Sequence, residues 1–412
     1  MPLVVQKFGG TSVADAERIR AVADHVARTR RRGSDVVVVV SAMGKETDDL
    51  LRLAGEVSTS RPGREMDMLI TAGERKAMAL VCMALHDLGV PADSFTGSQA
   101  GLITDTSHTD ARIVELRPDR VRAALAAGRV PVVGGAQGVS TARDVTFLGR
   151  GGSDTTAVAL AAALGAHACE KYSDVPGVFT ADPRLVPTAR RLPRISFEEM
   201  LEVSATGSGV LAHRSVEYAR NHGVRLHVRS SFTWEPGTWV EEEDPSMEQA
   251  IVSAVTHDVT EAKITVHGVP DRPGVAARLF RQLADRKVSV DMIVQNTSVS
   301  GATDISFTVP TADVAASLAA AEAVGDDIGA AGAEADEKIA RVSVVGAGMK
   351  TNPGVAATMF ETLAEAGINI EMISTSPIRI SCVIRGDQVE DAVRVLHDAY
   401  GLDRLDRGDP VA

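Results

Sequence analysis

Residues 149–156 carry the strongest chemical signal in the chain, because they read GRGGSDTT and lead into a run of strong helix formers. Glycine permits positive φ and lets another group approach the backbone closely. A glycine turn that opens a helix presents free N–H groups and the positive end of the helix dipole to an anion. Arg150 adds a planar donor fork, and Ser153 and Asp154 are good helix N-caps. The stretch predicts an anion site; the alternative is a tight capped loop with its arginine in solvent.

Lys7 is the second chemical signal, because it lies inside an apolar strand expected at residues 3–8 and is followed closely by Gly9 and Gly10. We interpret it as a cation aimed at phosphates that the two glycine amides hold. The alternative is a lysine on an edge strand. Asp174 and Asp182 are candidates for a ribose or a magnesium ion, although Asp182 precedes a proline and also suits a turn. The spacing of the glycines at residues 149–156 fits neither the Walker lysine pattern nor the dinucleotide pattern.

Strands alternate with helices over the first 240 residues, which predicts a mostly parallel sheet covered by helices on both faces. The first helix is expected to span about 20 residues and to end near Gly33. In such sheets ligands bind beyond the carboxyl ends of the strands. The candidate motifs follow such ends, at residues 7–10, 41–44, 134–135 and 172–174. The sequence therefore predicts that they meet in one site.

The composition excludes several classes of protein. The chain of 412 residues should hold about two or three domains, and its formal net charge of −12 argues against general nucleic-acid binding or a basic membrane patch. Cys82, Cys169 and Cys382 lie far apart and form neither a metal spacing nor an even disulfide set. No apolar run approaches the roughly 20 residues of a membrane helix. We expect a soluble cytoplasmic protein without a nucleic-acid or membrane partner.

A turn-rich acidic stretch at residues 235–245 reads as a domain boundary and precedes an internal repeat. Residues 273–277 (PGVAA) recur at 353–357, and the same offset relates Phe280 to Phe360. Each unit is expected to form a strand, a helix opened by Pro-Gly, two strands and a helix. A duplicated structural module without a ligand is the alternative to a binding function.

The ordered motifs of the first 240 residues resemble aspartate kinases of the amino-acid kinase fold. They are KFGGTS at 7–12, SAMG at 41–44, TAGE at 71–74, FTGSQAG at 95–101, GRGGSDTT at 149–156 and the segment 174–184. The resemblance implies that Lys7 and Asp154 handle the transferred phosphoryl group. The residues implied for aspartate are Ser41, Thr47, Glu74, Arg150, Gly151, Gly152 and Ser153, with Glu74 on the amino group and Arg150 on a carboxylate. The residues implied for the nucleotide are Lys7, Phe8, Gly9, Gly10, Ser173, Asp174, Thr180, Asp182, Arg184 and Val210.

The chain departs from the family pattern in four places. Family members usually carry a lysine where this chain has Gly209, within the GSGV of residues 207–210. The loss of that cation either weakens ATP binding or is compensated by another group. Glu46, Lys76 and Ala136 are also unusual, and Glu46 adds a negative charge beside Thr47.

The repeats resemble a pair of ACT domains, which bind regulatory amino acids between paired units. The resemblance implies lysine or threonine as effector, and an oligomer or an alpha/beta assembly through ACT pairing; an internal start at Met247 is permitted. The positions implied for the effector site are Asp271, Gly274, Ala276, Asp291, Gln295, Asn296, Val355, Ala356, Asn369, Ile370, Ser376 and Pro377. Pro377 stands where relatives often have glutamate, so altered feedback sensitivity is expected.

The sequence thus predicts an α/β amino-acid kinase domain at 1–240, a linker with a strand at 241–260, and two α+β ACT domains (βαββαβ) at 261–335 and 336–405. The expected reaction is phosphorylation of the side-chain carboxylate of L-aspartate by ATP with Mg²⁺, on the way to lysine, threonine and methionine. The metal is expected to arrive with ATP rather than to be held by protein ligands alone. A carboxylate acceptor is already ionised at neutral pH, so catalysis needs positioning and neutralisation of charge rather than a general base. Two alternatives are a kinase for a related carboxylate in a specialised pathway and a regulatory protein that has lost catalysis.

Overall fold

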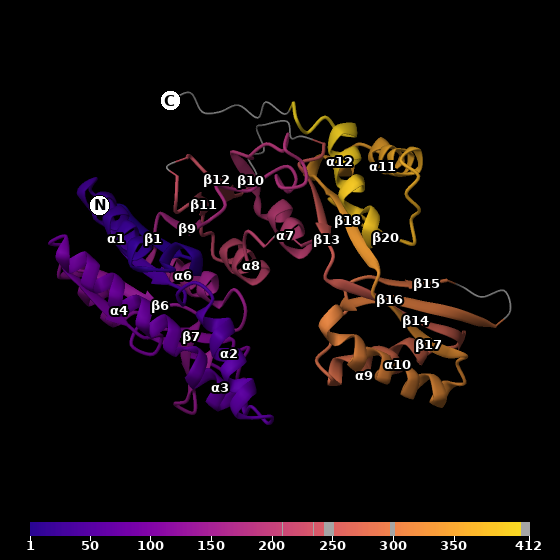
Figure 1. The fold of residues 1–412 in the computed structure, drawn as a ribbon, viewed down its shortest axis with the longest axis horizontal. Coiled ribbons are helices and arrows are strands. Elements are labelled where there is room, and N and C mark those ends of the chain that lie inside the picture. Colours follow the sequence, from indigo (N-terminus) through magenta and orange to yellow (C-terminus); the bar gives the residue numbers. More distant parts are fainter. Residues whose placement is uncertain (208, 234, 243–250, 297–300, 405–412) are drawn as a thin grey trace.

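We describe residues 1–207, 209–233, 235–242, 251–296 and 301–404 of a computed structural model. Ser208 and Met247, which the sequence analysis singled out, and the linker positions 243–250 lie outside this range. Figure 1 shows an amino-terminal α/β part, coloured indigo to magenta, beside two smaller sheets with their own helices. The molecule therefore has the kinase-like part and the repeated part that the sequence predicted.

Eight strands of the described residues form the central sheet of the amino-terminal part. Their spatial order is β10 (Arg194–Ser196), β12 (Thr238–Glu241), β11 (Leu226–Ser230), β9 (Ala168–Ser173), β1 (Leu3–Phe8), β2 (Asp35–Val40), β6 (Val130–Gly134) and β3 (Ala92–Phe95). Neighbouring strands are parallel except for the antiparallel pair β11–β12. The predicted mostly parallel sheet is confirmed.

Helices cover both faces of this sheet. One face packs against α1 (Ala16–Arg31) and α4 (Ala72–Asp87). The other packs against α5 (Asp119–Ala126), α6 (Gly152–Leu164), α7 (Phe197–Ala205) and α8 (His213–Asn221). Strand β1 supplies both cores, because Val5 faces α6 whereas Val4 and Phe8 face α1. Lys7, two positions after Val5, consequently lies on the α6 face.

The first helix is shorter than the sequence suggested. A 3₁₀ turn at Gly10–Val13 comes first, and α1 begins only after Asp15, whose side chain accepts a hydrogen bond from the Arg18 N–H (2.9 Å). An aspartate in extended conformation that accepts from the third N–H is a favourable N-cap and fixes the helix start. Two further helices, α2 (Glu46–Val57) and α3 (Gly63–Ile70), lie beyond β2, and a small sheet contains β5 (Ile113–Leu116), β4 (Leu102–Thr104), β7 (Gln137–Ser140) and β8 (Val145–Phe147).

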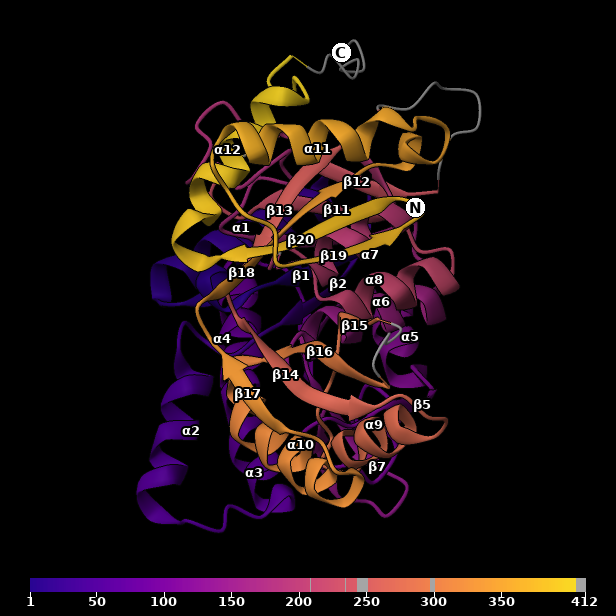
Figure 2. The ribbon, with the colours of Figure 1, turned by 90° about the vertical axis from the view of Figure 1, so that its right-hand side faces the viewer.

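The two repeat units each form a four-stranded sheet with two helices. The first has the order β15 (Ile293–Gln295), β16 (Ala302–Pro310), β14 (Glu261–Pro270) and β17 (Gly332–Asp336), with α9 (Val275–Asp285) and α10 (Val314–Ile328). The second has β13 (Ala254–Asp258), β18 (Ile339–Val345), β20 (Arg379–Arg385) and β19 (Met372–Ser376), with α11 (Gly354–Glu365) and α12 (Val389–Ala399). In Figures 1 and 2 the helices of the two units lie at opposite ends of the paired sheets.

Strand β13 follows the linker and belongs to the second unit rather than to the first. It precedes the first unit in the chain but pairs antiparallel with β18, so it is the fourth strand of the second sheet. The second unit also packs against the amino-terminal part, because Ala181 and Val186 share its core and Thr180 Oγ1 lies 3.0 Å from His397 Nε2. The two halves are therefore joined by a core and not only by a linker.

In the described part of the chain, none of the helices has the length and apolar character needed to cross a bilayer. The three cysteines are buried as free thiols.

Candidate functional site

Two lysines and one aspartate meet over β1 and β9, two neighbouring strands in the middle of the central sheet. Lys7 on β1 and Lys171 on β9 are directly opposite each other in the parallel ladder, so their side chains leave the same face of the sheet. Lys7 Nζ forms an ion pair with Asp154 Oδ1 at 2.6 Å, and Lys171 Nζ donates a hydrogen bond to Asp154 Oδ2 at 2.5 Å. Asp154 lies in the first turn of α6, which packs on that face. The sequence predicted Lys7 and Asp154 as partners in one site, and the structure brings them together.

The cluster holds two amino groups and one carboxylate. Burial by itself would raise the pKa of Asp154, but the charges of Lys171 and Lys7 outweigh it and hold the pKa well below its usual range. Burial lowers the pKa of Lys171, and Asp154 opposes that shift. Asp154 is thus an ionised carboxylate that positions two ammonium groups, and with both lysines protonated one positive charge is left for a ligand.

The glycine turn before α6 is required by close packing. Gly151 caps α6 at φ 71°, and a Cβ there would lie 2.3 Å from the Cβ of Ala212. Gly151 is the N-cap, so the expectation that Ser153 or Asp154 caps this helix is corrected: both lie inside its first turn. A cap at Gly151 brings the Asp154 carboxylate onto the first turn and over the end of β1.

A cavity of about 580 Å³ opens over this cluster, and we call it the lysine cavity. It brings together six of the residues predicted from the sequence and also Lys171, which the sequence analysis missed. The predicted residues in its lining are Lys7, Ser41, Arg150, Gly151, Ser153 and Asp154. The sequence signal for Lys171 was the same as that for Lys7, a lysine within a strand just before the turn.

Glu74, at the start of α4, is 3% exposed, and its Oε2 has no hydrogen-bond partner among the described residues. Burial raises the pKa of Glu74 to about 7 from its ordinary 4.5, although backbone N–H groups of Glu74 and Ala42 donate to the carboxylate and oppose the shift. A buried carboxylate with an unpaired oxygen is costly unless a cation meets it. This geometry suits an ammonium group of a ligand.

The unusual residues Glu46 and Lys76 form an ion pair, with Lys76 Nζ 2.5 Å from Glu46 Oε1. The extra negative charge that the sequence analysis placed beside Thr47 is therefore balanced by the second unusual residue. Thr47 is half-buried in the first turn of α2, next to Glu46. Ala136 has φ 56°, in the left-handed region. A Cβ built on Gly152 would lie 3.0 Å from the Cβ of Ala136.

The turn after β1 explains why two glycines are present. A Cβ at Gly10 would lie 2.9 Å from the Gly44 carbonyl oxygen and 3.0 Å from that of Ala42, so glycine lets the ends of β1 and β2 approach. The Gly9 N–H donates to the Tyr172 carbonyl (3.0 Å), which means that this amide is already used and gives no support to the phosphate contact predicted for it. Phe8 is buried and stacks on Tyr172 at 4.9 Å, so its side chain belongs to the core.

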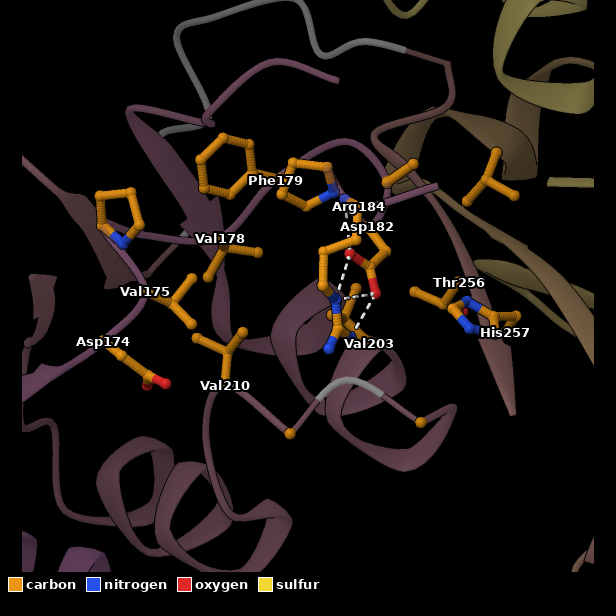
Figure 3. A pocket seen from close by; sticks show the side chains of 16 residues that line it. Asp174, Val175, Val178, Phe179, Asp182, Arg184, Val203, Val210, Thr256 and His257 are labelled. Carbon is orange, nitrogen blue, oxygen red and sulfur yellow. Dashed lines mark hydrogen bonds and ion pairs between the residues drawn. The ribbon is translucent and has the colours of Figure 1, made fainter. Parts of the chain in front are cut away.

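A second cavity, of about 520 Å³, adjoins the first, because Gly207 and Gly209 line both. We call it the Asp174 cavity. It brings together four residues predicted to hold the nucleotide, Asp174, Asp182, Arg184 and Val210. Figure 3 shows Asp174 and Val210 on one side and the Asp182–Arg184 pair on the other. The hydrogen bond from Arg184 lowers the pKa of Asp182, which is therefore ionised at neutral pH.

Two other predicted nucleotide residues have mainly structural contacts. Thr180 is fully buried; its Oγ1 accepts from the Arg190 N–H (2.9 Å) and contacts His397. Ser173 Oγ accepts from the Val175 N–H (3.3 Å) at the end of β9. Thr256 and His257 of β13, which were not predicted, line the Asp174 cavity. The second repeat unit thus supplies part of the wall of this cavity.

The effector positions predicted in the first repeat unit lie mainly on its surface. Asp271, Gly274, Gln295 and Asn296 are exposed, whereas Ala276 is half-buried near the start of α9. Asp291 forms an ion pair with Arg341 of the second unit. This residue therefore lies at the contact between the two units.

In the second unit the predicted effector positions are divided between core and surface. Val355 is buried, Ala356 and Ile370 are half-buried, and Asn369 and Pro377 are exposed. Ser376 Oγ donates to Glu202 Oε1 of α7 at 2.8 Å, and Arg379 Nη1 lies 3.2 Å from the other oxygen of that carboxylate. The hydroxyl of Ser376 is thus tied to the amino-terminal part.

Comparisons with known proteins agree with this arrangement. Residues 2–230 match the amino acid kinase family, and residues 264–324 and 342–400 match the ACT domain. The aspartokinase of Mycolicibacterium smegmatis is 56% identical over 407 residues, which cover 98% of this chain and 97% of that protein. The chain belongs to the aspartokinases of the amino acid kinase family. An aspartokinase phosphorylates aspartate (EC 2.7.2.4), so the family and the enzyme class predicted from the sequence are confirmed.

Solved aspartokinase structures share the whole fold. Aspartokinase III of E. coli in complex with aspartate and ADP (R-state) has a TM-score of 0.82 at 25% identity and covers 96% of this chain and 99% of its own. The same enzyme in complex with lysine and aspartate (T-state) has a TM-score of 0.74 at 26% identity, with the same coverage. The aspartokinase fold with carboxy-terminal ACT domains is confirmed over nearly the full chain.

Proposed function

We propose that Lys7 and Asp154 are the centre of phosphoryl transfer from ATP to the side-chain carboxylate of L-aspartate. The observation that supports this proposal is the buried Lys7–Asp154–Lys171 cluster, which lines the lysine cavity. That cavity adjoins the Asp174 cavity. Transfer between two anions is limited by their repulsion, and preorganised cations reduce it. The oxygen of the aspartate carboxylate attacks the γ-phosphorus, the bond to the β-phosphate oxygen breaks, and ADP leaves with the electron pair. No proton has to be removed from the acceptor.

The lysine cavity suits the amino-acid substrate. Arg150 lines this cavity and presents a guanidinium that suits a carboxylate. Glu74 is not one of the lining residues, but it offers an unpaired carboxylate oxygen for the ammonium group. Ser41 and the first turn of α6 add hydroxyl and N–H donors. This charge pattern distinguishes an α-amino acid with an acidic side chain from a simple dicarboxylate, because only the amino acid supplies a cation for Glu74.

The Asp174 cavity suits ATP. Carboxylate oxygens are ligands that Mg²⁺ accepts, and Asp174 lines the cavity, so we assign it to the metal that accompanies the nucleotide. When bound, the ion neutralises phosphate charge. Val178, Phe179 and Val210 supply apolar surface for the base.

Regulation by an amino acid, lysine or threonine, would reach the active site through the second unit. Strand β13 belongs to the second ACT sheet and also contributes Thr256 and His257 to the nucleotide wall. Arg341 of β18 is 1% exposed and donates to the carbonyl of Ala205 at the end of α7 (2.9 Å), while it pairs with Asp291 of the first unit. A change in how the two units pack would therefore move α7 and the wall of the Asp174 cavity. Pairing of ACT units between chains, in a homo-oligomer or an alpha/beta assembly, is the arrangement we expect to complete the effector sites.

A substrate panel tests this function. Purified protein is incubated with MgATP and one acid at a time (L-aspartate, L-glutamate, succinate), and acyl phosphate is trapped with hydroxylamine. We expect hydroxamate from L-aspartate and little from succinate, which lacks the ammonium group. Product from another acid but not from aspartate would contradict the proposal. Inhibition curves with lysine, threonine and both together then identify the effector.

A further inference from the structure

We propose that Lys171 is a second phosphate-binding cation of the active site, which acts beside Lys7 on the γ-phosphate during transfer. This inference rests on the proposed function. It adds a residue that neither the motif analysis nor the predicted set contained. Three features of the structure support it: the position of Lys171, the charge balance of its surroundings, and the open space beside Gly209.

The position of Lys171 is fixed by the sheet. Its register partner on β1 is Lys7, so the two ammonium groups approach the same carboxylate from neighbouring strands. The Lys171 side chain is 12% exposed, which is close to the 8% of Lys7. Both line the lysine cavity, and Gly207 and Gly209 connect that cavity to the Asp174 cavity. A phosphate chain that extends from the Asp174 cavity past Gly207 and Gly209 enters the cavity that both lysines line.

The charge balance shows that Lys171 does more than neutralise Asp154. One carboxylate balances one ammonium group, and Lys7 already pairs with Asp154 Oδ1. A second buried ammonium group is costly without a further anion. Asp258 also lines the cavity, but it lies 3.5 Å from Arg341 Nη2. The surplus cation is therefore available to a phosphate oxygen, which a compact, strongly hydrated ammonium group binds well.

The chain has no side chain at Gly209, where a cation could be added to the cavity wall. Gly209 lines both cavities, and a Cβ built on it meets no atom within 4 Å. A side chain would fit there, but the chain has none. Lys171 lines the same cavity and can supply the charge that position 209 does not, and Gly209 offers a place to supply that charge by substitution.

The first test is Lys171→Gln, which keeps a donor for Asp154 and removes the charge. We expect kcat to fall by about 10²-fold or more, as for other lost transition-state donors, with a KM for aspartate within about threefold of that of the unmodified protein. Binding of a non-hydrolysable ATP analogue should weaken about tenfold, whereas binding of ADP should change little. Lys263→Gln is the matched control, because Lys263 pairs with a single carboxylate, Glu371, away from both cavities; its kcat should stay unchanged.

The second test is rescue. Gly209→Lys in the Lys171→Gln background should restore kcat at least tenfold, because it returns a cation to the same cavity. A structural role for Lys171 would give a loss of thermal stability in Lys171→Gln and no rescue, and that result overturns the proposal. A kcat within threefold of the unmodified protein in Lys171→Gln also overturns it. Activity of the unmodified protein with aspartate is measured in parallel, so a failure of the proposed function is distinguished from a failure of this inference.

Discussion

Glu74 should reduce the stability of the protein in return for substrate binding. Burial raises its pKa to about 7 from 4.5, so its ionisation opposes folding. A group whose pKa is raised in the folded state contributes stability below its unfolded pKa, and this contribution is lost as the pH rises through the folded value. The difference corresponds to about 3 kcal/mol at a pH above both values. Glu74→Gln keeps the shape and removes the charge. We compare the free energy of unfolding of the variant with that of the unmodified protein at each pH. The advantage of the variant should be larger at pH 8 than at pH 4.5, by up to about 3 kcal/mol.

The assay is urea unfolding followed by tryptophan fluorescence at the two pH values. Trp239 lies in β12, so the signal reports the amino-terminal part in which Glu74 lies. The same variant should raise the KM for aspartate tenfold or more, since the ammonium group loses its carboxylate. A stability difference between variant and unmodified protein that is the same at both pH values would refute the buried, shifted carboxylate. An unchanged KM would refute its contact with the substrate.

Three further outcomes are expected. The KM for aspartate should rise as the pH falls below about 7, up to about tenfold per pH unit, and this slope should vanish in Glu74→Gln; initial rates from pH 6 to 8 measure it. Lys76→Met should raise that KM several-fold because Glu46 loses its partner, and Glu46→Gln added to Lys76→Met should reverse the effect; persistence in the double variant would exclude this cause. Arg341→Met should destabilise the protein by about 3–5 kcal/mol and reduce inhibition by the effector, whereas Arg385→Met, at a solvent-accessible ion pair, should have a much smaller effect on stability. Equal effects of the two arginine variants in unfolding and inhibition assays would contradict the role of Arg341.

The local signals in the sequence were sufficient for the main elements and the centre of the site. The unbroken apolar run of β2 and the glycines around Arg150 required only backbone preferences and strand burial, and they predicted a parallel sheet with ligands at the carboxyl ends of its strands. Lys7 followed from its place near the end of such a strand, and Asp154 from its place in the first turn of the helix that the glycines open. The aspartate specificity came from resemblance and not from the residue pattern.

Features that depend on distant pairing were not predictable. The pairing of Glu46 with Lys76 joins positions thirty residues apart, on α2 and α4, and nothing in the local sequence fixes that approach. The partners of Lys171 and the Gly9 amide depend on the β1–β9 register, which no local pattern contains. A strand was expected before the repeats, at the place of β13. Its pairing with the second sheet was not expected, because the whole first unit lies between β13 and that sheet in the chain. The contribution of His257 to the nucleotide wall follows only from that crossing.

The most direct test of the central claim is aspartate-dependent phosphoryl transfer in the unmodified protein beside Lys7→Met. We expect that, with MgATP and L-aspartate, ADP and hydroxylamine-trapped acyl phosphate form in equal amounts, and that Lys7→Met lowers kcat at least 10²-fold while the fold is retained. A protein that binds ATP but forms no acyl phosphate with aspartate would contradict the account. Full activity in Lys7→Met would contradict the role of the buried lysine–aspartate cluster.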